Sequence, residues 1–271
     1  MKDQAEKLRK IVGNISNAKT ADKKICSIML LSPENENFDI SAPLSKAFAM
    51  REKKVLIIDD RFGVENLKTT FKFPPKETLK NYLQNECYID NIIGNICENV
   101  DWVSYRNYDS PIEIGNSDLS KFISDLSSVA ANYDYIIING GMEISENTLM
   151  LTNSAGAVIL TAAPNPASIT DAYSALKLLV SQMRAKENIY FLINTNGNEN
   201  ESEVQSVKEK FFALTEKFIN FTPNFLGFLS LKDSISFSDK INSTAEKIDE
   251  NNIGANQNFF ANFAQSIGGE L

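Results

Sequence analysis

Histidine is absent from the 271 residues of this chain. Its absence removes the commonest general base, the commonest zinc ligand and every nucleophile pair that needs an imidazole. The three cysteines, Cys26, Cys87 and Cys97, fit no metal-site spacing, and their odd number is typical of reduced intracellular thiols. We therefore expect no metal ion and no catalytic residue of these classes.

Positive charge is also scarce, because 27 Lys and Arg residues face 35 Asp and Glu residues, for a net charge of −8. Sequence-independent binding to nucleic acid depends on cations that neutralise phosphates, so we expect none. No apolar run approaches the roughly 20 residues of a membrane span, and the first residues lack the apolar core of a signal peptide. These features favour a cytoplasmic protein.

The C-terminal residues Phe259, Phe260, Phe263 and Ile267 form an apolar face at helical spacing. A helix that lies in a membrane interface carries basic residues on its polar face, and this chain has none after Lys247. We therefore expect the tail to pack on the domain core and not to act as a membrane anchor.

Strand-like and helix-like segments alternate along the chain. Strands are predicted at 25–31, 54–59, 100–105, 134–139, 156–162, 188–194 and 224–230, and helices at 40–51, 76–84, 117–131, 144–153, 167–184, 201–219 and 258–267. The strands are nearly continuous apolar runs, as a sheet covered on both faces requires. The pattern predicts one α/β domain over 25–271 with a doubly wound, mostly parallel sheet. An amphipathic helix with a polar tether is predicted at 1–24.

Glycine and lysine are missing from the loop where such a domain places its phosphate site, between the first strand and the first helix of the domain. The loop reads Ser32-Pro33-Glu34-Asn35-Glu36-Asn37-Phe38-Asp39. Phosphate loops use glycines for close approach, backbone N–H groups as donors and a Lys for the phosphates. Here a proline removes one donor and three carboxylates repel a triphosphate.

Three segments resemble the MinD/ParA-type deviant-Walker ATPases and, within them, the FlhG (YlxH, FleN) regulators of flagellar number. Asp3-Gln4-Ala5 with Leu8-Arg9 is similar to the DQAxxLR motif that opens FlhG proteins. Residues 54–67 are similar to the family's KVLLIDaDxGlaNv, and residues 164–173 to its tPEPtSlTDAY. The resemblance implies a MinD-like fold and a family that uses ATP and Mg²⁺.

The chain departs from that family at its nucleotide site. No Walker A motif (KGGVGK[TS]) is present, Arg61 stands at the second switch aspartate while Asp59 matches the first, and Asn139 stands at the metal-facing aspartate of Walker B. Asn194 matches the residue that reads the adenine ring. We expect a degenerate nucleotide site made of Ser32, Asp39, Asp59, Arg61, Asn139 and Asn194. We expect no bound cofactor and no ATP-driven dimer.

In the family, the DQAxxLR segment docks onto the SRP-type GTPase FlhF and stimulates its hydrolysis. The resemblance implies that Asp3, Gln4, Ala5, Leu8 and Arg9 contact this partner. The sequence therefore predicts a regulator that acts by protein contact, with other flagellar basal-body or polar proteins as further possible partners. Two alternatives stay open: a weak or partner-completed ATPase, and a non-enzymatic scaffold in a polar or flagellar assembly.

Overall fold

The structure, a computed structural model, describes residues 25–33, 39–59, 76–104, 115–183, 186–195, 201–230, 234–255, 259–260 and 262–263. Over these ranges, eight strands form one sheet in the order β3-β4-β2-β5-β1-β6-β7-β8. They are β1 (Cys26–Ser32), β2 (Val55–Asp59), β3 (Gly94–Cys97), β4 (Val100–Ser104), β5 (Tyr135–Gly141), β6 (Ala157–Ala162), β7 (Ile189–Thr195) and β8 (Asn224–Ser230). Only β3 and β4 pair antiparallel. The mostly parallel sheet confirms the predicted fold class.

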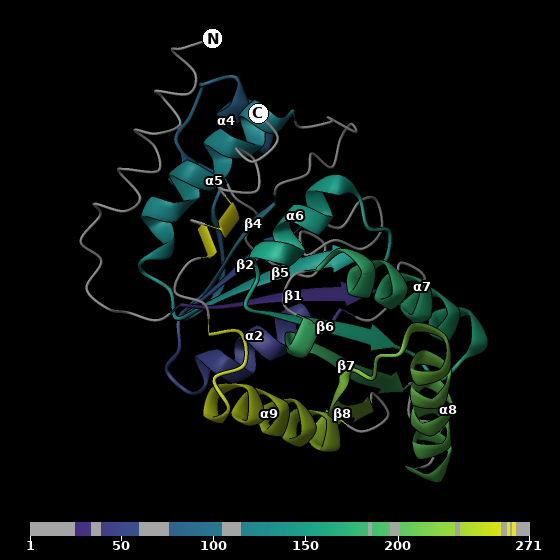
Figure 1. The fold of residues 1–271 in the computed structure, drawn as a ribbon. Coiled ribbons are helices and arrows are strands. Elements are labelled where there is room, and N and C mark those ends of the chain that lie inside the picture. Colours follow the sequence, from purple (N-terminus) through teal and green to yellow (C-terminus); the bar gives the residue numbers. More distant parts are fainter. Residues whose placement is uncertain are drawn as a thin grey trace.

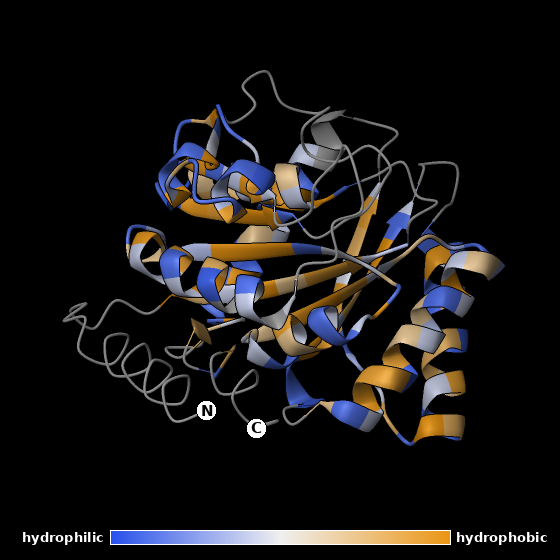
Figure 2. Ribbon diagram, turned by 90° about the horizontal axis from the view of Figure 1, so that it is seen from above, coloured by the Kyte–Doolittle hydropathy of each residue, from blue (hydrophilic) through white to orange (hydrophobic). Residues whose placement is uncertain are grey.

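Helices cover both faces of this sheet (Figure 1). They are α2 (Ser41–Ala49), α4 (Leu79–Leu83), α5 (Asn116–Ala130), α6 (Glu146–Ser154), α7 (Pro166–Gln182), α8 (Glu201–Ile219) and α9 (Ser234–Glu250), with 3₁₀ turns η1 (Ile89–Asn91) and η2 (Lys186–Asn188). Side chains of α2 and α9 form a core with one face, and side chains of α4 to α8 form a core with the other. Figure 2 shows the consequence: apolar strands lie between helices that carry both polar and apolar residues.

Local capping explains where two of the helices begin. The side chain of Asn165 accepts a hydrogen bond from the backbone N–H of Ser168, and Pro166 occupies the first turn of α7. Ser145 accepts from the N–H of Thr148 in the same way at the start of α6. Both arrangements satisfy backbone donors that a helix start leaves unpaired.

Two elements differ from the sequence prediction. The strand β3 and its antiparallel hairpin with β4 were not expected, because a run of four residues with a glycine gives a weak strand pattern. The helix α9 was also missed. Its described apolar stripe is narrow, with Ile241, Ala245 and Ile248 buried among polar neighbours.

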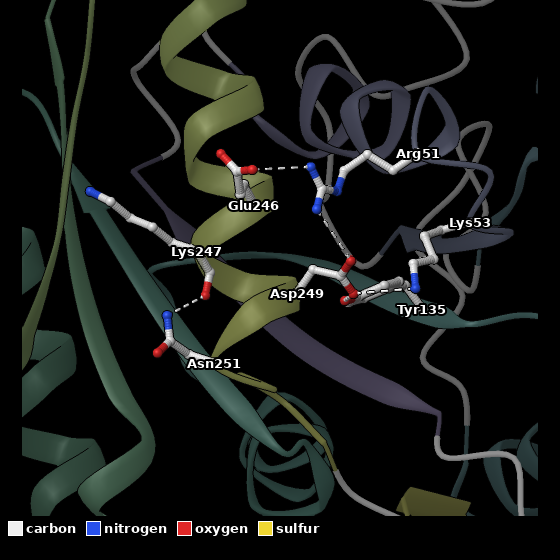
Figure 3. A network of polar contacts seen from close by, with 7 residues as sticks. All are labelled: Arg51, Lys53, Tyr135, Glu246, Lys247, Asp249 and Asn251. Atoms are coloured by element: carbon white, nitrogen blue, oxygen red, sulfur yellow. Dashed lines mark hydrogen bonds and ion pairs between the residues drawn. The ribbon is translucent and has the colours of Figure 1, made fainter.

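A polar cluster fixes the C-terminal end of α9 to the rest of the domain (Figure 3). The Asp249 carboxylate accepts a hydrogen bond from the Tyr135 hydroxyl at 2.7 Å. It also lies 3.4 Å from the Lys53 ammonium and 3.6 Å from the Arg51 guanidinium, which in turn lies 3.7 Å from Glu246. The cluster joins α9 to β5 and to the turn between α2 and β2.

After α9 the chain passes under the amino end of the central strand β1. The N–H of Ser27 donates to the carbonyl of Gly254 at 2.8 Å. Beyond this point Phe259, Phe260 and Phe263 are buried in the core on the opposite face. The prediction that these aromatic residues pack on the core is confirmed. Within the described ranges, no helix combines the length and apolar character needed to cross a bilayer.

The predicted division of the chain at residue 24 lies outside the described residues, since the structure describes nothing before Ile25. The same holds for the activator residues Asp3, Gln4, Ala5, Leu8 and Arg9, and for Arg61. Their roles stay predictions.

Candidate functional site

The carboxyl ends of β1, β2 and β5 meet at one edge of the sheet, where doubly wound proteins bind their ligands. In Figure 1 the arrowhead of β1 points to this edge. The parallel register places Asn139 of β5 opposite Leu30 of β1 on one side and opposite Asp59 of β2 on the other. The helix α2 begins at Ser41, at the end of the loop that leaves β1. Strand register therefore brings two of the predicted site residues, Asp59 and Asn139, to one place.

Asn139 joins two carboxylates at this edge. Its side-chain Nδ2 donates to Asp39 Oδ2 at 2.8 Å and to Asp59 Oδ1 at 3.2 Å. Asn139 and Asp59 have no exposed surface. Because an amide nitrogen carries two hydrogens and a carboxylate oxygen only accepts, an asparagine can bridge two aspartates where a third carboxylate would repel them.

Asp39 also caps the start of α2. Its Oδ1 accepts a hydrogen bond from the backbone N–H of Ser41 at 2.7 Å. The first turn of a helix presents free N–H groups and the positive end of the helix dipole, which is the usual anchor for a phosphate group. A carboxylate of the chain itself occupies part of this anchor.

Ser32 and Asn194 take no part in this cluster. The Ser32 hydroxyl lies 2.9 Å from the hydroxyl of Thr161 on β6, and both residues are buried. Asn194 ends β7, and its side chain is 4% exposed with neither polar atom hydrogen-bonded. The hydroxyl of the next residue, Thr195, is likewise buried without a partner. The carboxyl end of β7 thus carries an amide and a hydroxyl whose hydrogen-bonding capacity is unused.

The sequence analysis missed two residues of this edge, Ser41 and Thr161. Ser41 has a buried hydroxyl without a hydrogen-bond partner, and Asn139 likewise keeps an unpaired Oδ1. Thr161 was missed as the partner of Ser32. The signal that could have found them is position, since Ser41 starts the helix after the loop and Thr161 nears the end of a buried strand. Within the described residues, no three or more Cys, Asp or Glu side chains are placed to hold a metal ion.

Comparison with known proteins identifies proteins of similar sequence and solved structures of similar fold. No protein-family model matches the chain. The flagellum site-determining protein YlxH of Helicobacter pylori is 26% identical over 204 residues, which cover 72% of this chain and 67% of that protein. The antiactivator FleN of Pseudomonas aeruginosa is 22% identical over 198 residues, which cover 73% of this chain and 70% of that protein.

The chain is thus similar to YlxH and FleN over nearly three quarters of its length. The solved structure of the MinD cell division protein of Aquifex aeolicus shares the fold of this chain, with a TM-score of 0.56 and 16% identity over 90% of this chain and 97% of that one. An identity this low shows the fold alone. The Asp39–Asn139–Asp59 cluster therefore has to be interpreted from its own geometry.

Proposed function

We propose that this protein is a flagellar regulator that acts by protein contact and does not hydrolyse ATP. Relatives named for flagellum site determination and for antiactivation support the regulatory part of the proposal. The observation that carries the second part is the bridge from Asn139 to Asp39 and Asp59. In this bridge two carboxylates accept hydrogen bonds from an amide, at the edge where a nucleotide site needs free hydrogen-bond donors for phosphate groups and a free carboxylate for the metal ion.

The electrostatics of this edge oppose a bound triphosphate. The N–H of Ser41, a donor at the start of α2, is already used by Asp39. Two unit charges of like sign about 4 Å apart repel by about 4 kcal/mol at an effective dielectric constant of 20, so each phosphate oxygen near Asp39 meets a penalty of that order. The first lysine after the loop, Lys46, is exposed in the second turn of α2. Phosphoryl transfer depends almost wholly on positioning and charge neutralisation, and of the described residues at this edge Asp39, Asp59 and Asn139 supply no positive charge.

Titration calorimetry with Mg-ATP tests this part. We expect no measurable binding at 1 mM nucleotide, roughly the upper end of enzyme Michaelis constants. A low-micromolar dissociation constant would contradict it. Hydrolysis that starts only after a partner protein is added would favour the alternative of a partner-completed ATPase. Light scattering should also give one mass with and without ATP, since the loop 32–39 has no lysine to reach the phosphates of a second subunit.

The regulatory activity is proposed to reside in residues 1–19, which would stimulate an FlhF-type SRP GTPase. Gln4 would orient the attacking water, as a glutamine does in other GTPases. The apolar stripe of Ala5, Leu8 and Val12 would occupy a groove of the partner, with Arg9 at its rim. The length of strand β1 supports the proposal that residues 1–19 act independently of the nucleotide edge. Its seven residues separate Cys26, where this segment joins the domain, from Ser32 by about 20 Å.

GTP turnover by an FlhF-type GTPase tests this proposal. The wild-type chain should raise turnover with and without ATP, and Gln4→Ala should lose most of the increase. The matched control is Gln205→Ala, at an exposed position of α8. Equal turnover with the wild type and Gln4→Ala would leave the scaffold alternative as the better explanation.

Asn194 favours a second candidate function, recognition of a purine base without its phosphates. A buried amide without partners forgoes hydrogen bonds that a base edge could supply. Adenosine and ATP would then bind equally well and without Mg²⁺, and Asn194→Ala would abolish both. Binding of ATP but not of adenosine would refute this candidate.

A further inference from the structure

A polar hollow lies at the opposite edge of the sheet from the candidate nucleotide site. Its volume is about 480 Å³, and it lies where β2, β4 and β5 begin. The lining residues are Lys54, Asp90, Ile93, Gly94, Asn95, Asn99, Asp101, Val129, Asn132 and Tyr133. Three of them are asparagines, two are aspartates and one is a lysine, so the walls offer both hydrogen-bond donors and acceptors and carry one more negative than positive side chain.

The acidic side of the hollow is fixed by hydrogen bonds. The Asp101 carboxylate accepts from the Tyr133 hydroxyl at 2.8 Å and from Asn95 Nδ2 at 2.8 Å. Burial and this hydrogen bond raise the pKa of Tyr133, so its hydroxyl stays a donor. The Asp101 carboxylate is thus held in place by two hydrogen bonds at the wall of the hollow.

The chain around the hollow is acidic over a longer stretch. Residues 81–104 include four carboxylates and no lysine or arginine. Two residues before Asp90, the ring of Tyr88 is 83% exposed. An exposed aromatic ring beside a run of carboxylates suits a partner segment that is both basic and amphipathic.

Residues 1–24 of the same chain have that character. They contain seven lysines and arginines and three carboxylates, a net charge of +4, in a protein whose net charge is −8. Their predicted helix carries the apolar stripe of Ala5, Leu8, Val12 and Ile15. Charge and amphipathic pattern both match the acidic, partly aromatic surface around the hollow.

The place where this segment joins the domain puts it within reach. The N–H of Cys26 donates to the carbonyl of Asp134 at 2.9 Å, and the Asp134 carboxylate accepts from the N–H of Lys54, a lining residue, at 2.8 Å. Strand β4 lies three positions from β1 in the sheet, about 14 Å at the usual strand spacing. Cys26 follows Lys19 by seven positions, which span up to about 23 Å, so the basic residues nearest the domain can reach the hollow.

We propose that residues 1–24 dock on the hollow and the acidic segment 81–104 of their own domain, through their basic residues and apolar stripe. Docking would cover Gln4 and its neighbours, so the segment would be released only when a partner competes for it. This consequence rests on the proposed function, whereas docking itself does not. Docking of residues 1–24 would regulate the activator segment without any nucleotide.

Hydrogen exchange on the whole chain tests the docking. The variant Lys19→Glu/Lys23→Glu/Lys24→Glu reverses the charges nearest the domain, and Lys177→Glu/Lys186→Glu/Lys210→Glu, at exposed positions elsewhere, is the matched control. Amides of residues 89–101 should exchange at least about fivefold faster in the first variant than in the wild type and the control. Because about 1 M salt shortens the screening length to about 3 Å, it should accelerate the wild type to the same rate.

Equal exchange at 89–101 in all three proteins would overturn the docking. GTP turnover by the FlhF-type partner then separates the two proposals. Docking with no stimulation by any of the proteins would refute the proposed function and leave the docking intact. Stimulation that is equal in the wild type and the charge-reversal variant would refute the control by docking and leave the activator function intact.

Discussion

The substitution Asn139→Asp tests whether the amide bridge holds the sheet edge together. Asn139 Nδ2 donates to Asp39 at 2.8 Å and to Asp59 at 3.2 Å, and the aspartate loses both donors while adding a charge. A hydrogen bond to a charged group contributes about 1.5–3 kcal/mol. Like charges about 3 Å apart repel by about 5 kcal/mol at an effective dielectric constant of 20.

Protonation limits this penalty. The new carboxyl would take up a proton and keep a single donor, so we expect a net loss of about 3–5 kcal/mol at pH 7, the range for breaking a buried pair. This is a large part of a typical folding free energy of about 5–15 kcal/mol. With a urea dependence of about 1–3 kcal/mol/M, the unfolding midpoint falls by roughly 1–5 M.

The loss should depend on pH in a defined direction. Burial and two neighbouring carboxylates raise the pKa of the new carboxyl in the folded protein above its unfolded value of about 3.9. The unfolded chain therefore binds fewer protons above that pH, and the variant loses stability as pH rises from about 4. Below about pH 4 the difference from the wild type should shrink.

Urea unfolding followed by circular dichroism at pH 4 and pH 7 measures both effects. The control Asn132→Asp adds the same charge at an exposed turn and should change the midpoint little. Asn139→Ala removes the bridge without a new charge and should destabilise the protein with much less pH dependence. Equal stability of Asn139→Asp and Asn132→Asp at pH 7 would refute the reasoning.

Two further predictions concern the C-terminal part of the domain. Burial alone raises the pKa of Asp249, but the hydrogen bond from Tyr135 and the charge of Lys53 lower it overall. The stabilising effect of Asp249 is therefore present above a pH of about 4 and is lost as pH falls through the lowered pKa. Asp249→Asn should cost about 1–2 kcal/mol of unfolding free energy at pH 7 and nothing near pH 2, measured by thermal unfolding. Gly254 has a φ of +83°, and a Cβ there would lie 2.8 Å from a backbone oxygen, so Gly254→Ala should cost about 1–3 kcal/mol, whereas Gly115→Ala, with open space around it, should cost less than 1 kcal/mol.

The sequence was sufficient to predict the parallel strands of the sheet, though not β3, because a strand covered on both faces must be apolar throughout. The segments around Ile28, Ile57, Ile137 and Ile159 all have this pattern, and all four residues are completely buried in the sheet. The helix α9 shows where this logic stops. A helix at the edge of a sheet needs only a few apolar contacts. Because most residues of α9 are polar, those few apolar residues give too weak a periodic pattern to predict the helix.

The structure brings together three of the six predicted site residues, Asp39, Asp59 and Asn139, whereas Ser32 and Asn194 lie outside their cluster. The three were expected at one site because the resemblance matches Asp59 and Asn139 to nucleotide-site positions and Asp39 ends the loop at the phosphate position. The bridge itself was not foreseeable, since it depends on the position of Asp39, just before α2, relative to Asn139 on β5. Ser32 was expected at the same site and instead pairs with Thr161.

The substitutions at this edge make physical sense only together. A carboxylate at position 39 beside the start of α2 satisfies a helix N–H, but it also brings a second charge close to the buried Asp59. A third carboxylate at position 139 would then need a cation to be tolerated, whereas an amide donates a hydrogen bond to each of the two carboxylates. Asp39 and Asn139 thus provide hydrogen bonds within the chain at a helix start and at a buried carboxylate. We propose that a ligand gains little at an edge where these groups already pair with one another, and this is the physical reason to look for control of this protein in its N-terminal segment.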